Sequence, residues 1–416
     1  MPATSPQLGL PRVGVVMARL IVDEEDRGIK PFVVWFNDGK EMNKGITSMV
    51  LLRRAGSKPL DHCITTFNHV RLQKSALLGD LQKPMDLRES FHSTIWRVSV
   101  GTLALATTLV PILKRSAFVA GKYSLRRHVN RPPNGSQPIV SFRTQHGPIL
   151  HALAQVAVYE HYTDETVCNF VDMRLDIRVR QGIAAAFEAV LANDVQSSLF
   201  ALSERCGAQG LFEYNNIIES QLEARGISIA EGDALVLCIR LASELILGRY
   251  SLPPAGNQQS LLARYEKCLF QYCCRLRARI DGDHRDDTFN TDVLPRCQAL
   301  VEAIGYRMAY EAAQKAQVPP DLQNSFEARV VLQNSGWFTE NIGLDMQAML
   351  DMELRAMDSI LPRLEQLLDS TDAEQYCTAP ILSDQSWVRF ISSLKTYRGN
   401  GSFNAQKGNS TLAAKI

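Results

Sequence analysis

The spacing of hydrophobic positions along this chain changes near residue 84. Before it, short runs rich in β-branched and aromatic residues are separated by polar turns, a pattern that predicts strands. The predicted strand-like runs cover residues 13–22, 31–36, 48–52 and 63–70. Asp38-Gly39 follows the second run and is a strong turn signal. We therefore expect the first 84 residues to form a small antiparallel sheet.

Beyond residue 84 the apolar residues recur at helical spacing. Four long helical patterns cover residues 87–127, 142–170, 177–206 and 233–250, and Pro132-Pro133-Asn134-Gly135 breaks the series after the first. Long apolar helices with short connections indicate a helix bundle. The most apolar stretch, 98–113, is shorter than the ~20 residues that span a bilayer. We expect it to be a core helix, with no membrane span.

A Pro- and Gly-containing linker at residues 251–260 separates a third region with further helical patterns. These patterns cover residues 261–280, 293–316, 322–332, 344–368 and 385–397. The predicted fold is mainly α. It consists of a small antiparallel β-domain fragment (1–84), a four-helix bundle (85–253) and a second, C-terminal helical domain (254–416). The tail from Arg398 is rich in Gly, Asn, Ser and Lys and is expected to be flexible.

Charge and cysteine content narrow the function classes. The 416 residues include 45 basic and 44 acidic side chains, which provides no electrostatic case for a nucleic-acid partner or an anionic membrane surface. Cys268, Cys273 and Cys274 cluster in sequence, but no histidine lies near them at a zinc-ligand spacing. No metal site is predicted. Free thiols in a reducing compartment are the preferred interpretation, and the N-terminal MPATSPQLGLP does not resemble a secretory signal.

Glu231 is the candidate catalytic residue. It lies in Ala230-Glu231-Gly232-Asp233, directly before a strongly apolar helix whose surface is expected to be mostly buried. A carboxylate at such a turn can act as a base, with burial raising its pKa and the helix dipole lowering it. The alternative is that acidic residues simply favour helix starts, which on spacing alone is the commoner situation.

Two further groups of residues are candidates for contact with a ligand. Arg126 and Arg127 lie near a helix end and suit a diphosphate, and Gln145 lies near the start of the next helix. Gly207 and Gly210 follow another helix and permit close approach of a ligand to the backbone. The alternatives are structural: arginines complement the carboxyl end of a helix, and glycine commonly ends one.

Taken in order, these segments resemble a known family. The series runs VVMARLIVDEEDRGIKPFVV from Val15, FNHVR at residues 67–71, then KYSLRR, SFRTQH, ERCGAQG and AEGD. Each piece is weak alone, and the ordered series is more specific. The chain resembles the acyl-CoA oxidases of the acyl-CoA dehydrogenase superfamily, and fungal oxidase-like sequences in particular, over about residues 13–400.

The resemblance implies a reaction and a cofactor. Such enzymes oxidise an acyl-CoA substrate to the trans-2-enoyl-CoA with FAD, and Glu231 matches the glutamate that removes the α-proton. One of Arg126 and Arg127, with Gln145, would contact the FAD of a neighbouring subunit, which implies a homodimer. Gly207 and Gly210 would let the backbone pass close to that cofactor. A specialised fungal metabolite is the expected acyl group.

The chain departs from the family in three places. It is expected to begin inside the family's β domain, without the N-terminal helical domain. Cys206-Gly207-Ala208-Gln209-Gly210 replaces the family's Cys-Gly-Gly-His-Gly, and Asp233-Ala234-Leu235 replaces a more polar run. These departures leave an alternative open: a non-catalytic, truncated paralogue that acts as a structural or dimerisation partner.

The last three residues, Ala414-Lys415-Ile416, form a small-basic-hydrophobic tripeptide. Tripeptides of the Ser-Lys-Leu type are read by the peroxisomal import receptor. We therefore expect a peroxisomal location, with the cytoplasm as the alternative if the tripeptide is a chance match.

Overall fold

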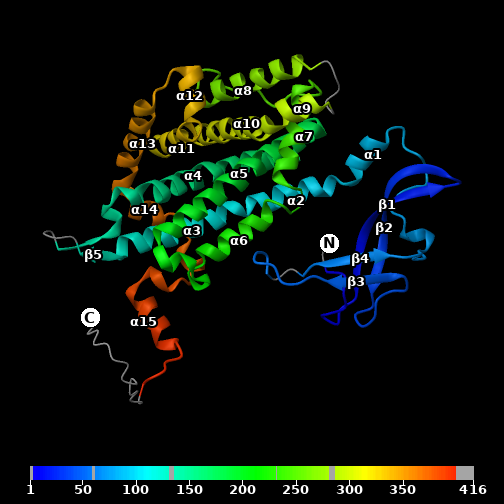
Figure 1. The fold of residues 1–416 in the computed structure, drawn as a ribbon, viewed down its shortest axis with the longest axis horizontal. Coiled ribbons are helices and arrows are strands. Elements are labelled where there is room, and N and C mark those ends of the chain that lie inside the picture. The colour runs from blue at the N-terminus through cyan, green and yellow to red at the C-terminus, as the bar shows by residue number, and fades with distance from the viewer. Residues whose placement is uncertain (1–2, 59–60, 131–134, 231, 281–285, 400–416) are drawn as a thin grey trace, which may run out of the picture.

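The computed structural model describes residues 3–399 apart from 59–60, 131–134, 231 and 281–285. Helices form a large body, and the strands of the first 67 residues form a separate lobe beside it (Figure 1). This arrangement agrees with the predicted mainly α fold that follows a small antiparallel β fragment. The first helix, α1 (Leu87–Thr94), joins the two parts and contacts β2.

The β lobe contains two antiparallel pairs. They are β1 (Arg12–Val22) with β2 (Glu25–Asn37), and β3 (Ile46–Val50) with β4 (Cys63–Phe67). Asp23 and Glu24 form the turn between β1 and β2, both with positive φ. Alternate residues of β1 face a small core around Val34, Phe36 and Ile46, and the others are exposed. The predicted strands thus form, with ends shifted by a few residues.

The prediction of one continuous helix over residues 87–127 was wrong. The structure has three successive helices there: α1, α2 (Trp96–Thr107) and α3 (Leu109–Arg126). The hydroxyls of Thr107 and Thr108 donate hydrogen bonds to the carbonyls of Ala104 and Leu105, respectively. These side-chain bonds compete with the backbone bonds that would continue a regular helix. Pro111 then lies in the first turn of α3, the part of a helix where proline is tolerated.

The stretch Trp96–Arg126 is long and apolar enough to cross a membrane by length and composition alone, with a mean hydropathy of 1.4. In the structure 56% of its apolar window is buried inside the protein. Leu109, Leu113 and Ala117 of α3 have no exposed surface and belong to the main hydrophobic cluster. Their apolar character therefore serves the core, as the sequence predicts for residues 98–113.

The two longest helices are α4 (Arg143–Val171) and α5 (Ile177–Arg205), which pack side by side. Pro148 lies inside α4 and cannot donate the hydrogen bond that the Thr144 carbonyl would accept in a regular helix. Arg205, the last residue of α5, donates to that carbonyl instead, at 2.7 Å. This contact ties the end of α5 to the start of α4.

The remaining helices complete the body (Figure 1). They are α6 (Ile217–Ile227), α7 (Ala234–Ile246), α8 (Leu261–Ala278), α9 (Asp287–Asp292), α10 (Leu294–Lys315), α11 (Pro320–Gln333), α12 (Ser335–Ile342), α13 (Met346–Ile360), α14 (Leu364–Asp369) and α15 (Asp384–Ser393). Short strands β5 (His128–Asn130) and β6 (Ser136–Pro138) follow α3. The sequence patterns did not predict α6, α9, α12 or this pair of strands.

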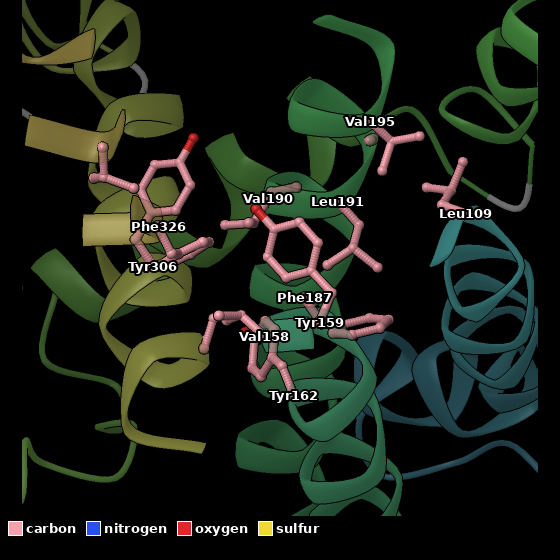
Figure 2. Close-up of a cluster of buried hydrophobic side chains, with 14 of the residues drawn as sticks. Leu109, Val158, Tyr159, Tyr162, Phe187, Val190, Leu191, Val195, Tyr306 and Phe326 are labelled. Carbon is pink, nitrogen blue, oxygen red and sulfur yellow. The ribbon is translucent and has the colours of Figure 1, made fainter. Parts of the chain in front are cut away.

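One hydrophobic cluster runs through the helical body on both sides of the linker at residues 251–260. Helix α10 contacts α4, α5 and α7. Gly305 of α10 faces α5 so closely that a Cβ there would lie 2.4 Å from the Val190 side chain. Figure 2 shows Phe187, Val190 and Leu191 between the α10 and α11 side chains on one side and Leu109 on the other. The domain boundary that we propose at residue 253 thus separates two groups of helices that share this core.

A single carboxylate, Asp194 of α5, connects four helices inside that core. It accepts hydrogen bonds from Gln155 (3.0 Å) and Tyr159 of α4 and from Tyr306 of α10 (2.9 Å). Arg329 of α11 donates to it at 2.6 Å and supplies the balancing charge. Burial, with the Asp194 charge adding to it, raises the pKa values of both tyrosines far above their ordinary range. Both hydroxyls therefore keep the protons that they donate.

Replacing Asp194 by alanine should destabilise the fold strongly. The Asp194 side chain is 2% exposed and that of Arg329 is 11% exposed, so the variant leaves a largely buried guanidinium without its counter-charge. Breaking such a pair costs about 3–5 kcal/mol of unfolding free energy. Urea denaturation followed by circular dichroism measures the change. Asp172→Ala, which removes the half-buried partner of the exposed Arg174, is the control and should change much less, because Arg174 stays solvated. Equal midpoints for the two variants would contradict the role given to Asp194.

Candidate functional site

The end of α3, the start of α4 and the turn after α5 meet at one end of the bundle. The end of α3, the turn after α5 and the segment 381–387 border a hollow of ≈ 290 Å³ there, which we call the arginine hollow. Its lining residues are Tyr123, Arg126, Arg127, His128, Gln209, Ile381, Asp384 and Trp387. The structure therefore brings both predicted ligand-binding arginines to one surface depression, together with a glutamine from the Cys206–Gly210 segment.

The two arginines differ in their surroundings. Arg126 is partly buried and pairs with Asp384 of α15, with Nε donating to Oδ1 at 2.8 Å. Its Nη1 donates to the carbonyl of Ile381 at 3.1 Å. Arg127 is exposed, and its guanidinium has no ion-pair or hydrogen-bond partner within the described part of the chain. A positive side chain thus faces the hollow ready to receive an anion.

Gln145 lies beside this region rather than in the lining of the hollow. It is in the first turn of α4, and its side-chain oxygen accepts a hydrogen bond from Ser124 of α3 at 3.3 Å. Ser124 is fully buried and precedes Arg126 by two residues. The pair holds the start of α4 against the end of α3, so Gln145 has a structural role besides its predicted cofactor contact.

The chain geometry explains both glycines. Gly207 follows α5 with φ +56°, and no atom lies within 4 Å of the place that its Cβ would occupy. Gly210 is buried, and a Cβ there would lie 2.1 Å from the Ser203 carbonyl oxygen. Only glycine permits that approach. Gly210 is therefore required by packing against the end of α5, whereas Gly207 leaves open space beside the backbone.

The second predicted site lies at the start of α7. Glu231 itself is outside the described residues. Asp233 caps α7, its carboxylate accepting from the backbone N–H groups of Leu235 (3.0 Å) and Val236 (3.2 Å). The expectation that most of α7 is buried was wrong for its first turn, where Leu235 is 48% exposed and Val236 60% exposed. The buried face begins only at Cys238, because α7 meets α5 and α10 on one side.

Glu188 of α5 is a site residue that the sequence analysis missed. It is 1% exposed, and neither carboxylate oxygen has a hydrogen-bond partner among the described residues. Burial raises the pKa of Glu188 to about 8, and the nearby charge of Asp233 adds to this effect. The group is therefore held largely as the neutral acid at pH 7, close to the start of α7. A lone acid within the apolar run AAAFEAVLA is the signal that could have revealed it.

The two predicted sites do not form a single cluster. The start of α7 lies near Glu188, whereas the arginine hollow lies near Arg205 at the end of α5. These positions are 17 residues apart on one helix (205 minus 188), or about 25 Å at 1.5 Å per residue. A single small ligand cannot reach both sites of one chain. A long ligand can, and in a pair of chains a site of one copy can lie close to a site of the other.

Glu231 and the C-terminal tripeptide are the predicted residues that meet no structural test. The tripeptide Ala414-Lys415-Ile416 lies outside the described residues. Among the described residues, no group of three or more His, Cys, Asp or Glu side chains is arranged to hold a metal ion. All nine cysteines are free.

The sequence patterns also did not identify Asp384 and Trp387 as residues of this site. They come from α15, more than 250 residues after Arg126 along the chain (384 minus 126 is 258). No local pattern marks such a contact, because it exists only once the C-terminal part of the chain has folded back onto α3.

No family profile matches this chain. Among curated proteins it is 24% identical over 328 residues to the peroxisomal acyl-coenzyme A oxidase 2 of Arabidopsis thaliana, covering 71% of this chain and 47% of the relative. It is 23% identical over 286 residues to acyl-coenzyme A oxidase 2 of Yarrowia lipolytica, covering 61% of this chain and 40% of the relative. The chain thus spans about half the length of these relatives.

Solved structures give the same answer for the fold. The acyl-CoA oxidase 1 of Arabidopsis thaliana superposes with a TM-score of 0.77 at 15% identity, covering 91% of this chain and 68% of the other. The acyl-CoA oxidase 1 of Yarrowia lipolytica has a TM-score of 0.77 at 14% identity, covering 97% and 71%. The acyl-CoA oxidase-1 of Caenorhabditis elegans, complexed with FAD and ATP, has a TM-score of 0.74 at 16% identity, covering 91% and 66%.

The helical body with its β lobe is therefore the fold of acyl-CoA oxidases. The curated relatives and the solved structures together support the assignment of this chain to the acyl-CoA oxidase/dehydrogenase superfamily, in agreement with the resemblance of its ordered motifs.

Replacing Glu188 by glutamine should remove a pH dependence of stability. In the folded protein Glu188 has a pKa of about 8, against an ordinary value of 4.5, so the folded state binds its proton more tightly than the unfolded state does. The unfolding free energy of the wild type should therefore fall as pH rises from about 5 to about 8, by at most about 5 kcal/mol.

Urea denaturation at several pH values measures this dependence. The difference in unfolding free energy, variant minus wild type, should grow with pH over that range and stop growing above it. Glu204→Gln changes an exposed carboxylate on the same helix and is the control. Parallel pH profiles of wild type and Glu188→Gln would contradict the buried neutral acid.

Proposed function

We propose that this chain catalyses flavin-dependent α,β-dehydrogenation of an acyl-CoA thioester to the trans-2-enoyl-CoA. The observation that carries the proposal is the agreement between relatives named acyl-CoA oxidases and structures of acyl-CoA oxidases, two of which, from Caenorhabditis elegans, contain bound FAD. The chain spans only part of each relative. Its activity, its cofactor and its substrate class are therefore all part of this proposal.

The residues around the arginine hollow fit the phosphate-bearing part of FAD. Guanidinium groups match a diphosphate in charge and in donor geometry, and Arg126 and Arg127 both line the hollow. Gln209 and Tyr123 add neutral hydrogen-bonding groups. The open space beside Gly207 leaves the backbone accessible to a ligand. Arg126 and Arg127, with Gln145 nearby, would hold the diphosphate, and Gly207 and Gly210 would border it.

Bound FAD would accept the hydride that leaves the β-carbon. In this proposal Glu231 removes the α-proton of the thioester. In the sequence Glu231 lies two residues before Asp233, the N-cap of α7, and the dipole at a helix N-terminus favours a carboxylate over its protonated form. The exposed apolar side chains of Leu235 and Val236 lie on that turn and offer a surface for an acyl chain. Along α5, about 25 Å separates Glu188, near the start of α7, from Arg205 beside the hollow, and this separation supports a homodimer in which each subunit contributes to both sites.

Location and pathway follow the same proposal. The Arabidopsis relative is named as peroxisomal, and Ala414-Lys415-Ile416 has the chemistry of a peroxisomal address. We propose import through the peroxisomal import receptor. We also propose an acyl group from a specialised fungal metabolite, on the resemblance to fungal sequences.

The first test is the flavin itself. The purified full-length protein, incubated with FAD and desalted, should retain a flavin absorbance band near roughly 450 nm, and an acyl-CoA series should bleach it without oxygen. Glu231→Gln should retain the flavin while bleaching at least about 10³-fold more slowly, since general-base catalysis contributes about that much. Stopped-flow absorbance measures the rate.

Asp233→Asn is the matched control, because it changes the carboxylate two positions away and asparagine also caps helices. It should bleach at the wild-type rate. Wild-type bleaching in Glu231→Gln would remove Glu231 from the role of base. A colourless protein that takes up no FAD would contradict the enzyme proposal and favour the alternative of a non-catalytic dimerisation partner.

A further inference from the structure

Arg126 is already occupied by an internal anion. The Asp384 carboxylate accepts from its Nε at 2.8 Å and lies 2.7 Å from its Nη2, while the Ile381 carbonyl accepts from Nη1 at 3.1 Å. Two guanidinium nitrogens thus converge on one oxygen of this carboxylate, and they are the same donors that arginine offers to a phosphate. An anionic ligand of Arg126 and the Asp384 carboxylate therefore compete for the same donors.

The charge around the hollow favours an incoming anion. Arg126, Arg127 and His128 line it, and Asp384 is the acidic residue among the lining side chains. Arg127 makes no ion pair within the described part of the chain. Pairing Asp384 with Arg126 leaves the positive charge of Arg127 uncompensated. A diphosphate can bind both guanidinium groups at once, whereas the carboxylate of Asp384 pairs with Arg126 alone.

Helix α15, which carries Asp384, is held by few contacts, among them the partly buried Trp387, which packs against the main hydrophobic cluster. None of its residues is buried, and Figure 1 shows it on the outside of the helical body. Its aromatic contacts are Phe390 against Tyr214, with ring centroids 4.5 Å apart, and Trp387 against Phe390 at 5.8 Å. Few buried contacts mean a low free energy of local opening.

The segment before α15 is anchored, by contrast. Pro380 and Ile381 are buried, and Ile381 belongs to the main hydrophobic cluster. Ser383, the N-cap of α15, has extended backbone angles and lies between the anchored segment and the helix. Opening at Ser383 would remove Asp384 and Trp387 from the hollow while leaving the rest of the helical body in place.

We propose that α15 is a displaceable cap on the arginine hollow: Asp384 holds Arg126 until a nucleotide diphosphate takes its place. The inference rests on the proposed function for the location of the ligand and adds the competing residue. Both FAD and coenzyme A carry a diphosphate, so the shared chemistry defines the ligand class. The apparent association constant for that ligand equals the intrinsic constant multiplied by the fraction of molecules in which α15 is open.

Asp384→Asn in the full-length protein tests the cap. Removing the carboxylate should tighten binding roughly two- to five-fold, the range expected for loss of a solvent-exposed ion pair that competes with the ligand. Calorimetric titration with FAD, coenzyme A and ADP measures the dissociation constants and identifies which source of diphosphate binds. Phe390→Ala loosens α15 without changing charge and should also tighten binding.

Asp369→Asn is the matched control. Asp369 is an exposed carboxylate that pairs at 2.6 Å with Lys122, one turn before Arg126 on the same helix, and its loss should leave the dissociation constants unchanged. Hydrogen–deuterium exchange provides a second measurement. Ligand at saturation should speed amide exchange in α15 and leave exchange in α14 unchanged.

The outcomes separate the cap from the proposed function. FAD binding that is unchanged or weaker in Asp384→Asn, with α15 equally protected in the complex, overturns the cap and leaves the flavin proposal standing. Tighter binding of ADP or coenzyme A without any binding of FAD supports the cap and contradicts the flavin proposal. No binding of any of the three ligands to wild type or variant contradicts both.

Discussion

The buried carboxylate of Asp194 is the interaction on which the helical body depends. One side chain of α5 receives hydrogen bonds from α4, α10 and α11, and Arg329 balances its charge. A buried charge is costly unless it is paired and fully hydrogen-bonded, so these four helices can pack only in the arrangement that satisfies it. The apolar contacts around it supply most of the burial but not this specificity. The helices before and after the linker at 251–260 therefore fold onto one another.

That arrangement positions both proposed sites along α5. At one end, Arg205 replaces the hydrogen bond that Pro148 cannot make, which holds α4 against α5 beside the arginine hollow. Toward the middle, the buried Glu188 lies near the start of α7. The first carries charged donors open to an anion, and the second combines a carboxylic acid without partners and an exposed apolar turn. These different environments suit the two ends of a reaction that needs a bound diphosphate and a base beside an acyl chain.

Much of the fold could be predicted because most segments have a clear period. The long patterns at 142–170 and 177–206 became α4 and α5 nearly to the residue. The errors have identifiable causes. Thr108 and Pro111 divide an apolar run that looks continuous, and α6 begins after Asn216 in a left-handed conformation that no local pattern indicates. Gly210 was noticed for a cofactor, yet contact with Ser203 of its own chain already requires it. The sequence could not show this, because the close approach arises only when the turn folds back on α5.

The sequence by itself determined the class of fold, the ordered motifs that resemble acyl-CoA oxidases, and the candidates Glu231, Arg126 and Arg127. These follow from residue type and local spacing, which are properties of neighbours along the chain. Only the tertiary structure decided that Asp384 neutralises Arg126, that Asp194 joins four helices, and that Glu188 is buried without a partner. Each of these depends on how far the group is removed from water and on partners that are distant along the chain. Arg126 and Asp384, for example, are 258 residues apart. Hydrogen bonding and burial change the charge state of a group only after distant segments have met.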